Sequence, residues 1–240
     1  MKILAVIPSR YKSSRFPGKP LAKIKGKEMI IRVVENCEKA LNKKNIVVAT
    51  DNKKIFNTVK KFQFSSIMTS KNCKTGTDRV AEVAKKIKAK IYLNIQGDEP
   101  LLKNQHIKKV ILKKIKYPNH VICAYSEIKN LLDLENDSIP KVVIGKKKQL
   151  IYISRSRVPN SNKNIIENKK YYKQVCIYAF NSKELSSYKK YGKKSKIEKM
   201  EDIEIIRFLE LGIPIKMVKV SSNTIAVDYK SDIKKVEKLL

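Results

Sequence analysis

Histidine and cysteine, which build most transition-metal centres and many nucleophilic triads, are scarce in this chain. Its 240 residues include only two histidines, His106 and His120, and neither lies in a pattern that pairs it with a serine and an aspartate. A Ser-His-Asp hydrolase is therefore hard to build. The four cysteines lie far apart and form no CxxC pair: Cys37, Cys73, Cys123 and Cys176. This spacing excludes the common zinc motifs and argues against a disulfide framework.

Long apolar runs are also missing. No stretch approaches the roughly 18 apolar residues that cross a bilayer. The apolar segment at residues 3–7 is too short for a secretory signal and leads directly into Pro8 and Arg10. We therefore expect a cytoplasmic protein with no membrane partner. Because 42% of the residues are hydrophobic, the chain can form a core, and its length fits one domain over residues 1–240.

Acidic residues are few, since 22 Asp and Glu stand against 54 Lys and Arg, for a formal net charge of +32. Such a balance is typical of proteins that bind nucleic acids. The lysines are spread along the whole chain, however, and no aromatic-basic stripe or recognised binding motif accompanies them. Lysine, isoleucine and asparagine are all abundant and share A/T-rich codons. We therefore favour genomic base composition as the source of the charge, with specific nucleic-acid binding as the alternative.

Strand and helix signals alternate through the first half of the chain. Buried-strand patterns fall at residues 2–7, 45–50, 66–69 and 91–95. Helix patterns lie between and after them, at residues 28–41, 53–62, 78–87 and 104–115. Repeated βαβ units of this size predict an α/β fold with a mostly parallel, Rossmann-like sheet covered by helices on both faces.

The pattern changes after a strand at residues 121–125. Strand patterns at 140–144, 149–154 and 172–180 predict an inserted antiparallel portion at about residues 140–200. The polar segment at 159–170 predicts a mobile loop between them. The fold is then completed by a predicted helix, strand and helix at residues 197–210, 214–220 and 230–240.

The loop that follows the first strand, RYKSSRFPGKPL at residues 10–21, is rich in groups that hold phosphates. In an open parallel sheet, ligands bind beyond the carboxyl ends of the strands, where this loop must lie. Guanidinium forks, hydroxyls and backbone N–H groups form polyphosphate cradles, although the GxxxxGK[ST] order of a P-loop is absent. The alternative is a solvated basic turn. Because only seven of the 54 cations are arginines, the pair Arg10 and Arg15 favours phosphate binding.

Two acidic positions are candidates for a metal site at the same edge of the sheet. Asp98 and Glu99 follow the strand at residues 91–95, and Asp228 follows an apolar segment near the C-terminus. Mg²⁺ commonly takes one or two carboxylates together with substrate phosphates. Taken singly, each residue has an alternative to metal binding: Asp98 could belong to a turn at the end of the strand, and Asp228 could cap the N-terminus of the last helix.

At this point the sequence resembles the 3-deoxy-manno-octulosonate (Kdo) cytidylyltransferases. The resemblance lies in RYKSSRFPGKPL, TGTDR, NIQGDEP, YISR and AVDYKSDI, which begin at residues 10, 75, 94, 152 and 226. These strings occur in the family's order, so the resemblance covers essentially the whole chain. It implies a fold of the nucleotide-diphospho-sugar transferase type, CTP, Mg²⁺ and a homodimer. It also implies that the antiparallel portion serves dimerisation and sugar binding.

The resemblance also implies roles for particular residues. Contacts to CTP are implied for Arg10, Ser13, Arg15, Lys19, Arg79 and Gln96. Contacts to the sugar acid are implied for Arg155, Gln174, Tyr178 and Glu198. Asp98 and Asp228 would hold Mg²⁺, and Arg10, Lys19 and Asp98 would carry catalysis. The alternatives are a strand-end surface arginine for Arg155 and an ordinary first-turn acidic residue for Glu198.

The sugar side departs from the family pattern. Gln174 and Cys176 stand where the family usually has His and Gly, and Lys199 stands where it has His or Gln. If Lys199 faces the sugar, its ammonium would disfavour an amino sugar; the alternative is that it points to solvent. The implied activity is transfer of CMP from CTP to the anomeric hydroxyl of Kdo, with release of pyrophosphate, for lipopolysaccharide synthesis. The alternatives are a related acid, either amino-Kdo or a nonulosonic acid, and a basic nucleic-acid-binding protein.

Overall fold

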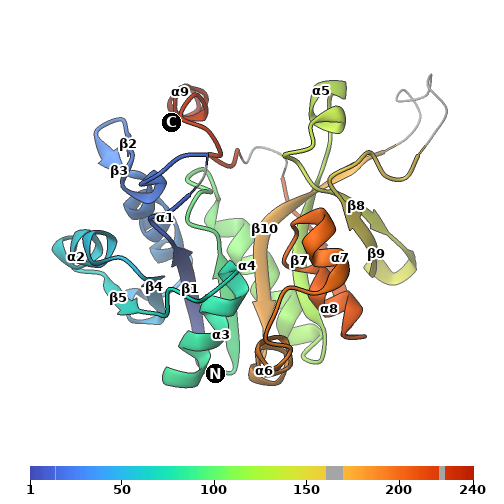
Figure 1. The fold of residues 1–240 in the computed structure, drawn as a ribbon, viewed down its shortest axis with the longest axis horizontal. Helices are drawn as coiled ribbons and strands as arrows, with labels where there is room; N and C mark the ends of the chain where they lie inside the picture. The colour runs from blue at the N-terminus through green and yellow to red at the C-terminus, as the bar shows by residue number, and fades with distance from the viewer. Residues whose placement is uncertain (14, 161–169, 222–224) are drawn as a thin grey trace.

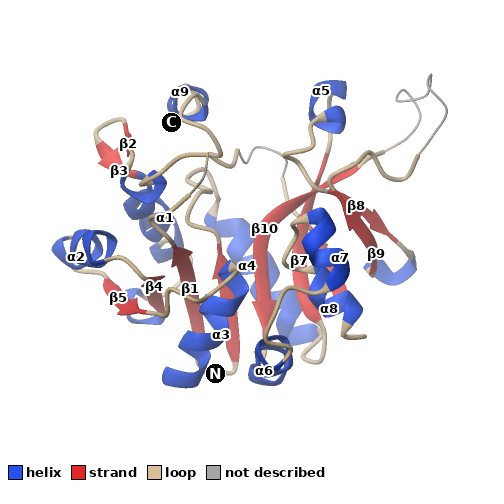
Figure 2. Ribbon diagram, in the orientation of Figure 1, coloured by secondary structure: helices blue, strands red, loops and turns tan. Residues whose placement is uncertain are grey.

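A mixed β-sheet forms the centre of the molecule (Figures 1 and 2). The computed structural model describes residues 1–13, 15–160, 170–221 and 225–240. The strands of the large sheet are β1 (Ile3–Ser9), β4 (Ile46–Thr50), β5 (Ser65–Met68), β6 (Ile91–Ile95), β7 (Val121–Glu127), β8 (Lys141–Ile144), β9 (Leu150–Ser154), β10 (Tyr172–Phe180) and β11 (Ile215–Lys219). A separate small hairpin pairs β2 (Lys23–Ile24) with β3 (Lys27–Glu28).

The strand order is β11-β7-β10-β6-β1-β4-β5, with β8 and β9 branching from β10. Strands β6, β1, β4 and β5 are parallel to one another, and β11 is parallel to β7. Strand β10 runs antiparallel to both of its neighbours, β6 and β7 (Figure 2). The predicted α/β fold, a mostly parallel sheet with an inserted antiparallel portion, is therefore confirmed.

Nine α-helices surround this sheet in the described part of the chain (Figure 1). They are α1 (Met29–Glu38), α2 (Lys53–Lys61), α3 (Gly76–Lys86), α4 (Asn104–Lys116), α5 (Leu131–Glu135), α6 (Ser182–Lys190), α7 (Lys196–Glu201), α8 (Ile206–Glu210) and α9 (Asp232–Glu237). Helices α1, α2 and α4 supply the core on one face, and α3, α6 and α8 supply it on the other. Figure 1 shows this second set in front of the sheet.

Side-chain alternation along the strands explains why both faces need helices. In β1, Leu4 and Val6 point into one core cluster, whereas Ala5 and Ile7 point into the other. All four side chains are at most 2% exposed. A strand that is apolar on both faces must be covered on both faces, which is the usual situation of a parallel sheet. This leaves the loops beyond the strand ends as the places where polar groups gather.

The helices of the second half differ from the prediction in two places. The helix predicted at residues 197–210 is two short helices, α7 and α8, because Asp202 takes a left-handed conformation with φ of 50° and ends α7. Helices α5 and α6 were not predicted, although Asn181 and Glu184 form a capping box at the start of α6. The loop predicted at 159–170 falls almost entirely on residues outside the described part of the chain.

None of the helices in the described ranges is both long enough and apolar enough to span a bilayer.

Candidate active site

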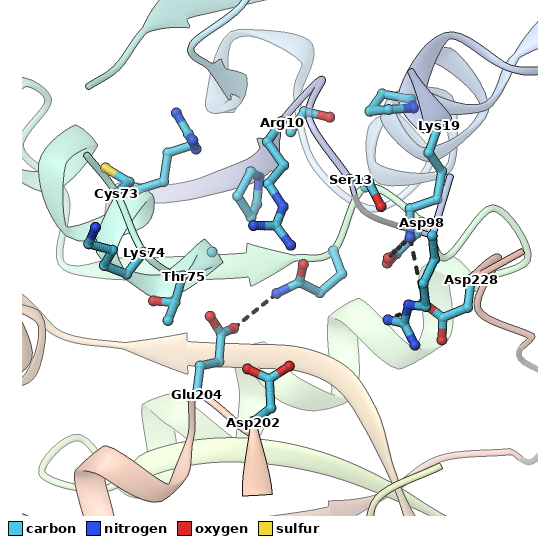
Figure 3. Close-up of a pocket in the computed structure, with 18 of the residues that line it drawn as sticks. Arg10, Ser13, Lys19, Cys73, Lys74, Thr75, Asp98, Asp202, Glu204 and Asp228 are labelled. Carbon is cyan, nitrogen blue, oxygen red and sulfur yellow. Dashed lines mark hydrogen bonds and ion pairs between the residues drawn. The ribbon is translucent and has the colours of Figure 1, made fainter. Parts of the chain in front are cut away.

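The ends of two neighbouring parallel strands form the floor of a polar cavity of about 280 Å³ (Figure 3). Strands β1 and β6 are paired in register, so the residues that follow them, Arg10 and Gln96, emerge at the same edge. Gly97 makes this close approach achievable, since a Cβ there would lie 3.1 Å from Ser9 Oγ and 3.2 Å from the Pro8 carbonyl oxygen. The glycine of the QGDEP string thus has a steric role.

The loop after β1 folds back over the cavity. Gly18 has a φ of 71°, packs against the Tyr11 ring, and donates its N–H to the Tyr11 carbonyl at 2.9 Å. A side chain at this φ would be strained, so glycine is favoured there. The fold of this loop brings Arg10, Ser13, Arg15 and Lys19 into the cavity wall, as the sequence predicts.

Two carboxylates and two cations form a cluster at one end of the cavity. Lys19 Nζ donates to Asp98 Oδ2 at 2.6 Å and to the Val227 carbonyl at 2.8 Å, and lies 3.8 Å from Asp228 Oδ1. Arg15 pairs with Asp228 at 2.9 Å. Figure 3 shows Asp98 and Asp228 side by side near Lys19. Residues 130 positions apart in the chain, Asp98 and Asp228, are therefore neighbours, as a shared metal site requires.

Arg10 and Arg79 differ in how much of their guanidinium is available. Arg10 is exposed in the cavity and has no hydrogen bond or ion pair to any described residue. Arg79 is 3% exposed, pairs with Asp51 at 3.1 Å, and also donates to the hydroxyl of Thr69. Arg10 is thus free to bind an anion, whereas Arg79 mainly shapes the cavity wall.

Glu204, which sequence reasoning missed, lies on the opposite wall. Its carboxylate accepts hydrogen bonds from Thr77 N at 2.9 Å, Gln96 Nε2 at 3.0 Å and Asn94 Nδ2 at 3.2 Å. Loss of hydration raises the pKa of Glu204, while the hydrogen bonds from Thr77 lower it. No local signal marks this residue, because it falls within the helix that the sequence predicts; only the break at Asp202 brings it to the cavity.

A second cavity of about 860 Å³ adjoins the first, and Asp228 lines both. Gln174 and Cys176 of β10 line it, as do Lys103, Lys173 and Glu99. Burial, with the neighbouring charge of Asp98, raises the pKa of Glu99 to about 8. Burial also raises the pKa of the Cys176 thiol. Of the four residues predicted to bind the sugar acid, only Gln174 lines either cavity.

The other three predicted sugar contacts have their polar groups engaged within the protein. Arg155 donates to the carbonyls of Asp137, Ser138, Glu201 and Asp202. Glu198 is fully buried in an ion pair with Arg207 at 2.7 Å. Tyr178 is 2% exposed in the core. The structure does not bring these three to the cavities, because tertiary partners that the sequence pattern does not reveal hold them elsewhere.

Lys199 also lies away from the cavities. Its side chain is exposed on α7 and lines neither of them. This placement agrees with the alternative, that Lys199 points to solvent, and gives no support to selection against an amino sugar by its ammonium, which stays a prediction.

The acidic residues of the site form a pair rather than a complete metal centre. Within the described ranges, no group of three or more His, Cys, Asp or Glu residues is arranged to hold a metal ion. Asp98 and Asp228 are the two carboxylates that converge at the junction of the cavities. Oxygen donors of this kind suit a hard cation such as Mg²⁺ when substrate oxygens supply the remaining ligands.

Comparisons with known proteins agree with this geometry. The 3-deoxy-manno-octulosonate cytidylyltransferase of Protochlamydia amoebophila is 36% identical over 247 residues, which cover 100% of this chain and 94% of that protein. The 8-amino-3,8-dideoxy-manno-octulosonate cytidylyltransferase of Shewanella sp. (strain W3-18-1) is also 36% identical, over 245 residues covering 100% of this chain and 99% of that protein.

Solved structures show the same relationship. The CTP complex of CMP:2-keto-3-deoxy-manno-octonic acid synthetase superimposes with a TM-score of 0.90 at 34% identity, covering 100% of this chain and 98% of that one. A cytidylyltransferase from Leptospira borgpetersenii, at 15% identity and a TM-score of 0.63, shares the fold over 99% of this chain and 85% of its own. A family model described as cytidylyltransferase matches residues 4–220. The chain therefore belongs to the cytidylyltransferase family and is a nucleotidyltransferase.

Proposed function

We propose that this enzyme transfers CMP from CTP to the anomeric hydroxyl of Kdo and releases pyrophosphate. The observation that carries the proposal is a pair of adjoining cavities that share Asp228, the smaller lined by an arginine- and lysine-rich loop. Such an arrangement suits a triphosphate in one cavity and an acceptor in the next. The full-length similarity to Kdo cytidylyltransferases supports the choice of acceptor.

The loop after β1 is the proposed triphosphate site. Arg10 brings a guanidinium with no protein partner in the described chain, and Ser13 brings a hydroxyl to the same wall. Arg15 and Lys19 are already oriented by Asp98 and Asp228. Because these two cations are already held in place, they can stabilise charge that develops on the phosphates with little reorganisation. Arg79 and Gln96 line the same cavity and complete the proposed nucleotide site.

Asp98 and Asp228 are the residues that would hold Mg²⁺. Two carboxylates suffice when a metal ion arrives with the nucleotide, because the phosphates supply further oxygen ligands. When bound, the ion would neutralise phosphate charge and act as a Lewis acid. The Lys19 ammonium lies 2.6 Å from Asp98 and 3.8 Å from Asp228, so it keeps the two carboxylates oriented toward one place.

The chemical step is a single substitution at phosphorus. The anomeric oxygen of the sugar acid forms a bond to the α-phosphorus and gives up its proton to water, while the bond from that phosphorus to the bridging oxygen breaks and pyrophosphate leaves with the electron pair. Arg10, Arg15 and Lys19 stabilise the charge that accumulates on the leaving pyrophosphate. The remaining contribution of the protein is to hold the acceptor next to the α-phosphate, since orientation alone removes a large part of the barrier.

The larger cavity is the proposed sugar-acid site. Gln174 offers both a hydrogen-bond donor and an acceptor to sugar hydroxyls, and Lys103 brings positive charge for a carboxylate, whereas Lys173 is paired with Asp133 at 2.9 Å. The 8-amino analogue is the second candidate acceptor. One observation favours it, the similarity to the two Shewanella relatives.

Pyrophosphate release with CTP and a panel of acids tests the assignment. We expect release with Kdo at a kcat/KM above that for the 8-amino analogue and for nonulosonic acids, with Mg²⁺ supporting the reaction. Release with another acid but none with Kdo would contradict the acceptor and leave the cytidylyltransferase class intact. Omitting the acid is the control, since hydrolysis of CTP alone must stay low.

We also propose that the enzyme is a homodimer that acts in the cytoplasm for lipopolysaccharide synthesis. Ile151 of β9 and Met200 of α7 are 61% and 78% exposed, and both lie in the antiparallel portion of the chain. Exposed apolar side chains in one region are typical of protein interfaces. The mass in solution, measured by light scattering, should correspond to two chains, and Ile151→Glu should lower it to one.

A further inference from the structure

Three hydrogen-bond donors converge on the carboxylate of Glu204. They come from three different segments: the N-terminus of α3 through Thr77 N, strand β6 through Asn94 Nδ2, and the loop after β6 through Gln96 Nε2. An anion at the N-terminus of α3 is also favoured by the helix dipole. These three contacts lie on the cavity wall, and they fix the position of the Glu204 side chain there.

This arrangement determines the orientation of the Gln96 amide. The two ends of an amide are alike in shape, so its orientation is set by its partners. The Glu204 carboxylate accepts from Gln96 Nε2 at 3.0 Å and also from Thr77 N and Asn94 Nδ2, so the Gln96 nitrogen faces Glu204 and Oε1 faces away from it. Oε1 makes no hydrogen bond to a described residue and is not a buried atom, while Gln96 lines the smaller cavity. An acceptor of fixed direction is thus open to the cavity.

Gly76, the first residue of α3, leaves room for this arrangement. A Cβ at this position would lie 2.9 Å from Gln96 Nε2 and 3.4 Å from Glu204 Oε2. The first of these distances is shorter than ordinary van der Waals contact, so any side chain at position 76 would push the amide away. The close packing of three elements around the amide therefore limits its rotation.

We propose that Glu204 is a positioning residue for substrate binding, which holds Gln96 so that Oε1 accepts a hydrogen bond from a donor on the substrate. This inference rests on the proposed function. Two donors fit the chemistry: an N–H group of the cytosine base, or a hydroxyl of the sugar acid. Cytosine presents an amino group where uracil presents a carbonyl oxygen, so an acceptor at the base would select CTP over UTP.

A double-mutant cycle separates this role from a purely structural one. Glu204→Gln replaces an obligate acceptor with an amide that also donates, so Gln96 loses its single orientation. Gln96→Met removes the acceptor at similar volume. We expect each change to weaken substrate binding about fivefold to tenfold, and the double variant to bind no worse than Gln96→Met. Glu210→Gln is the matched control, because Glu210 accepts from Ile197 N and Glu198 N in the same segment but lines neither cavity.

Whether the base or the sugar acid supplies the hydrogen-bond donor to Gln96 Oε1 follows from which constant changes, the Kd for CTP or the KM for the acid. The Kd for CTP is measured by calorimetry in the absence of any sugar acid. If the variants have a higher Kd for CTP and a smaller preference for CTP over UTP, the donor belongs to the base. An unchanged Kd for CTP with a higher KM for the acid assigns it to the sugar. Gly76→Ala displaces Gln96 and leaves the Glu204 charge in place, so it should reproduce the loss if Glu204→Gln fails to fold.

Two results would overturn the proposal. One is unchanged binding of both substrates in Glu204→Gln and Gly76→Ala, and the other is independent losses that multiply in the double variant. The proposed function is judged separately by transfer to Kdo in the unaltered enzyme. If that transfer fails, the KM of the variants is measured with whichever sugar acid the unaltered enzyme uses. The Kd for CTP is measured without any acid, so that part of the test is unaffected.

Discussion

Glu198 and Glu204 lie six residues apart and are engaged in different ways. Glu204 takes neutral donors at the cavity wall, whereas both oxygens of Glu198 bind the Arg207 guanidinium, at 2.7 Å to Nε and 2.8 Å to Nη2. Asp78 also contacts this guanidinium, at 3.3 Å. Arg207 is 1% exposed, so its charge depends on these carboxylates for compensation. Glu198 therefore serves the interior of the protein.

Glu198→Gln should destabilise the protein without altering substrate specificity. The substitution leaves the buried Arg207 charge with Asp78 as its one remaining carboxylate partner among the described residues, and removing a partner from a buried ion pair costs about 3–5 kcal/mol. We expect a loss of this size in the free energy of unfolding, measured with urea, and an unchanged KM for the sugar acid in the folded fraction. A raised KM at undiminished stability would instead return Glu198 to the sugar site, as the sequence predicts.

Asp98→Asn should abolish most of the activity and leave the fold intact. The substitution keeps the side-chain shape but removes one of the two charges proposed to hold Mg²⁺, and Asp98 is partly exposed, so little packing is lost. We expect kcat to fall by at least about a hundredfold, with an unchanged circular dichroism spectrum. Near-normal turnover at ordinary Mg²⁺ would refute the assignment. Glu127→Gln, which breaks the surface pair with Lys219, is the control.

At the level of whole elements, the start of α4 contains a pH-dependent group. His106 is 2% exposed and its Nε2 lies 2.7 Å from Ser221 Oγ, next to β11. Burial lowers the pKa of His106 to about 4, and the charges of Lys103 and Lys109 act in the same direction. The folded protein therefore favours the neutral imidazole, and protonation favours unfolding.

The stability that His106 contributes should be complete above its ordinary pKa of 6.5 and should be lost as the pH falls from 6.5 toward 4. A shift of this size corresponds to roughly 3 kcal/mol at the acid end. His106→Gln, which keeps a polar partner for Ser221, should flatten the dependence of the melting temperature on pH in this window. An equally steep dependence in the variant would show that other groups are responsible.

The same elements show what the sequence can and cannot predict. Continuous apolar runs identified β1, β4 and β6, because a strand buried on both faces is apolar at almost every position, and a one-sided apolar face identified α1. The break between α7 and α8 was missed because Asp202 interrupts no apolar period. For the candidate site, the loop after β1 and Asp98 both follow strands, which chain order reveals, whereas the role of Asp228 is implied by the resemblance to the family. Glu204, by contrast, reaches the cavity only through tertiary packing that spacing does not encode.

The net charge of +32 belongs to the whole molecule, yet it affects the site. Lysines cover the surface far from the cavities, and most have no acidic partner nearby because acidic residues are so few. A uniformly positive surface produces a long-range field that attracts anions. It supplies no sequence-specific contacts to a nucleic acid, since reading bases requires groups placed in a groove. The substrates proposed for this enzyme are themselves anions, so the field assists their approach.

Added salt should therefore weaken the binding of anionic substrates and leave the rate of the chemical step unchanged. The Debye length falls from about 10 Å at 0.1 M to about 3 Å at 1 M, so added salt screens the surface field while close contacts in the cavity persist. We expect KM for CTP to rise severalfold between low and high salt with little change in kcat, and binding of uncharged cytidine to stay constant. Duplex DNA should bind weakly, with a steep salt dependence and no sequence preference. A KM for CTP that is insensitive to salt would contradict the proposed attraction of substrates by the surface charge. Tight, sequence-selective DNA binding at physiological salt would show that the positive surface binds nucleic acid specifically.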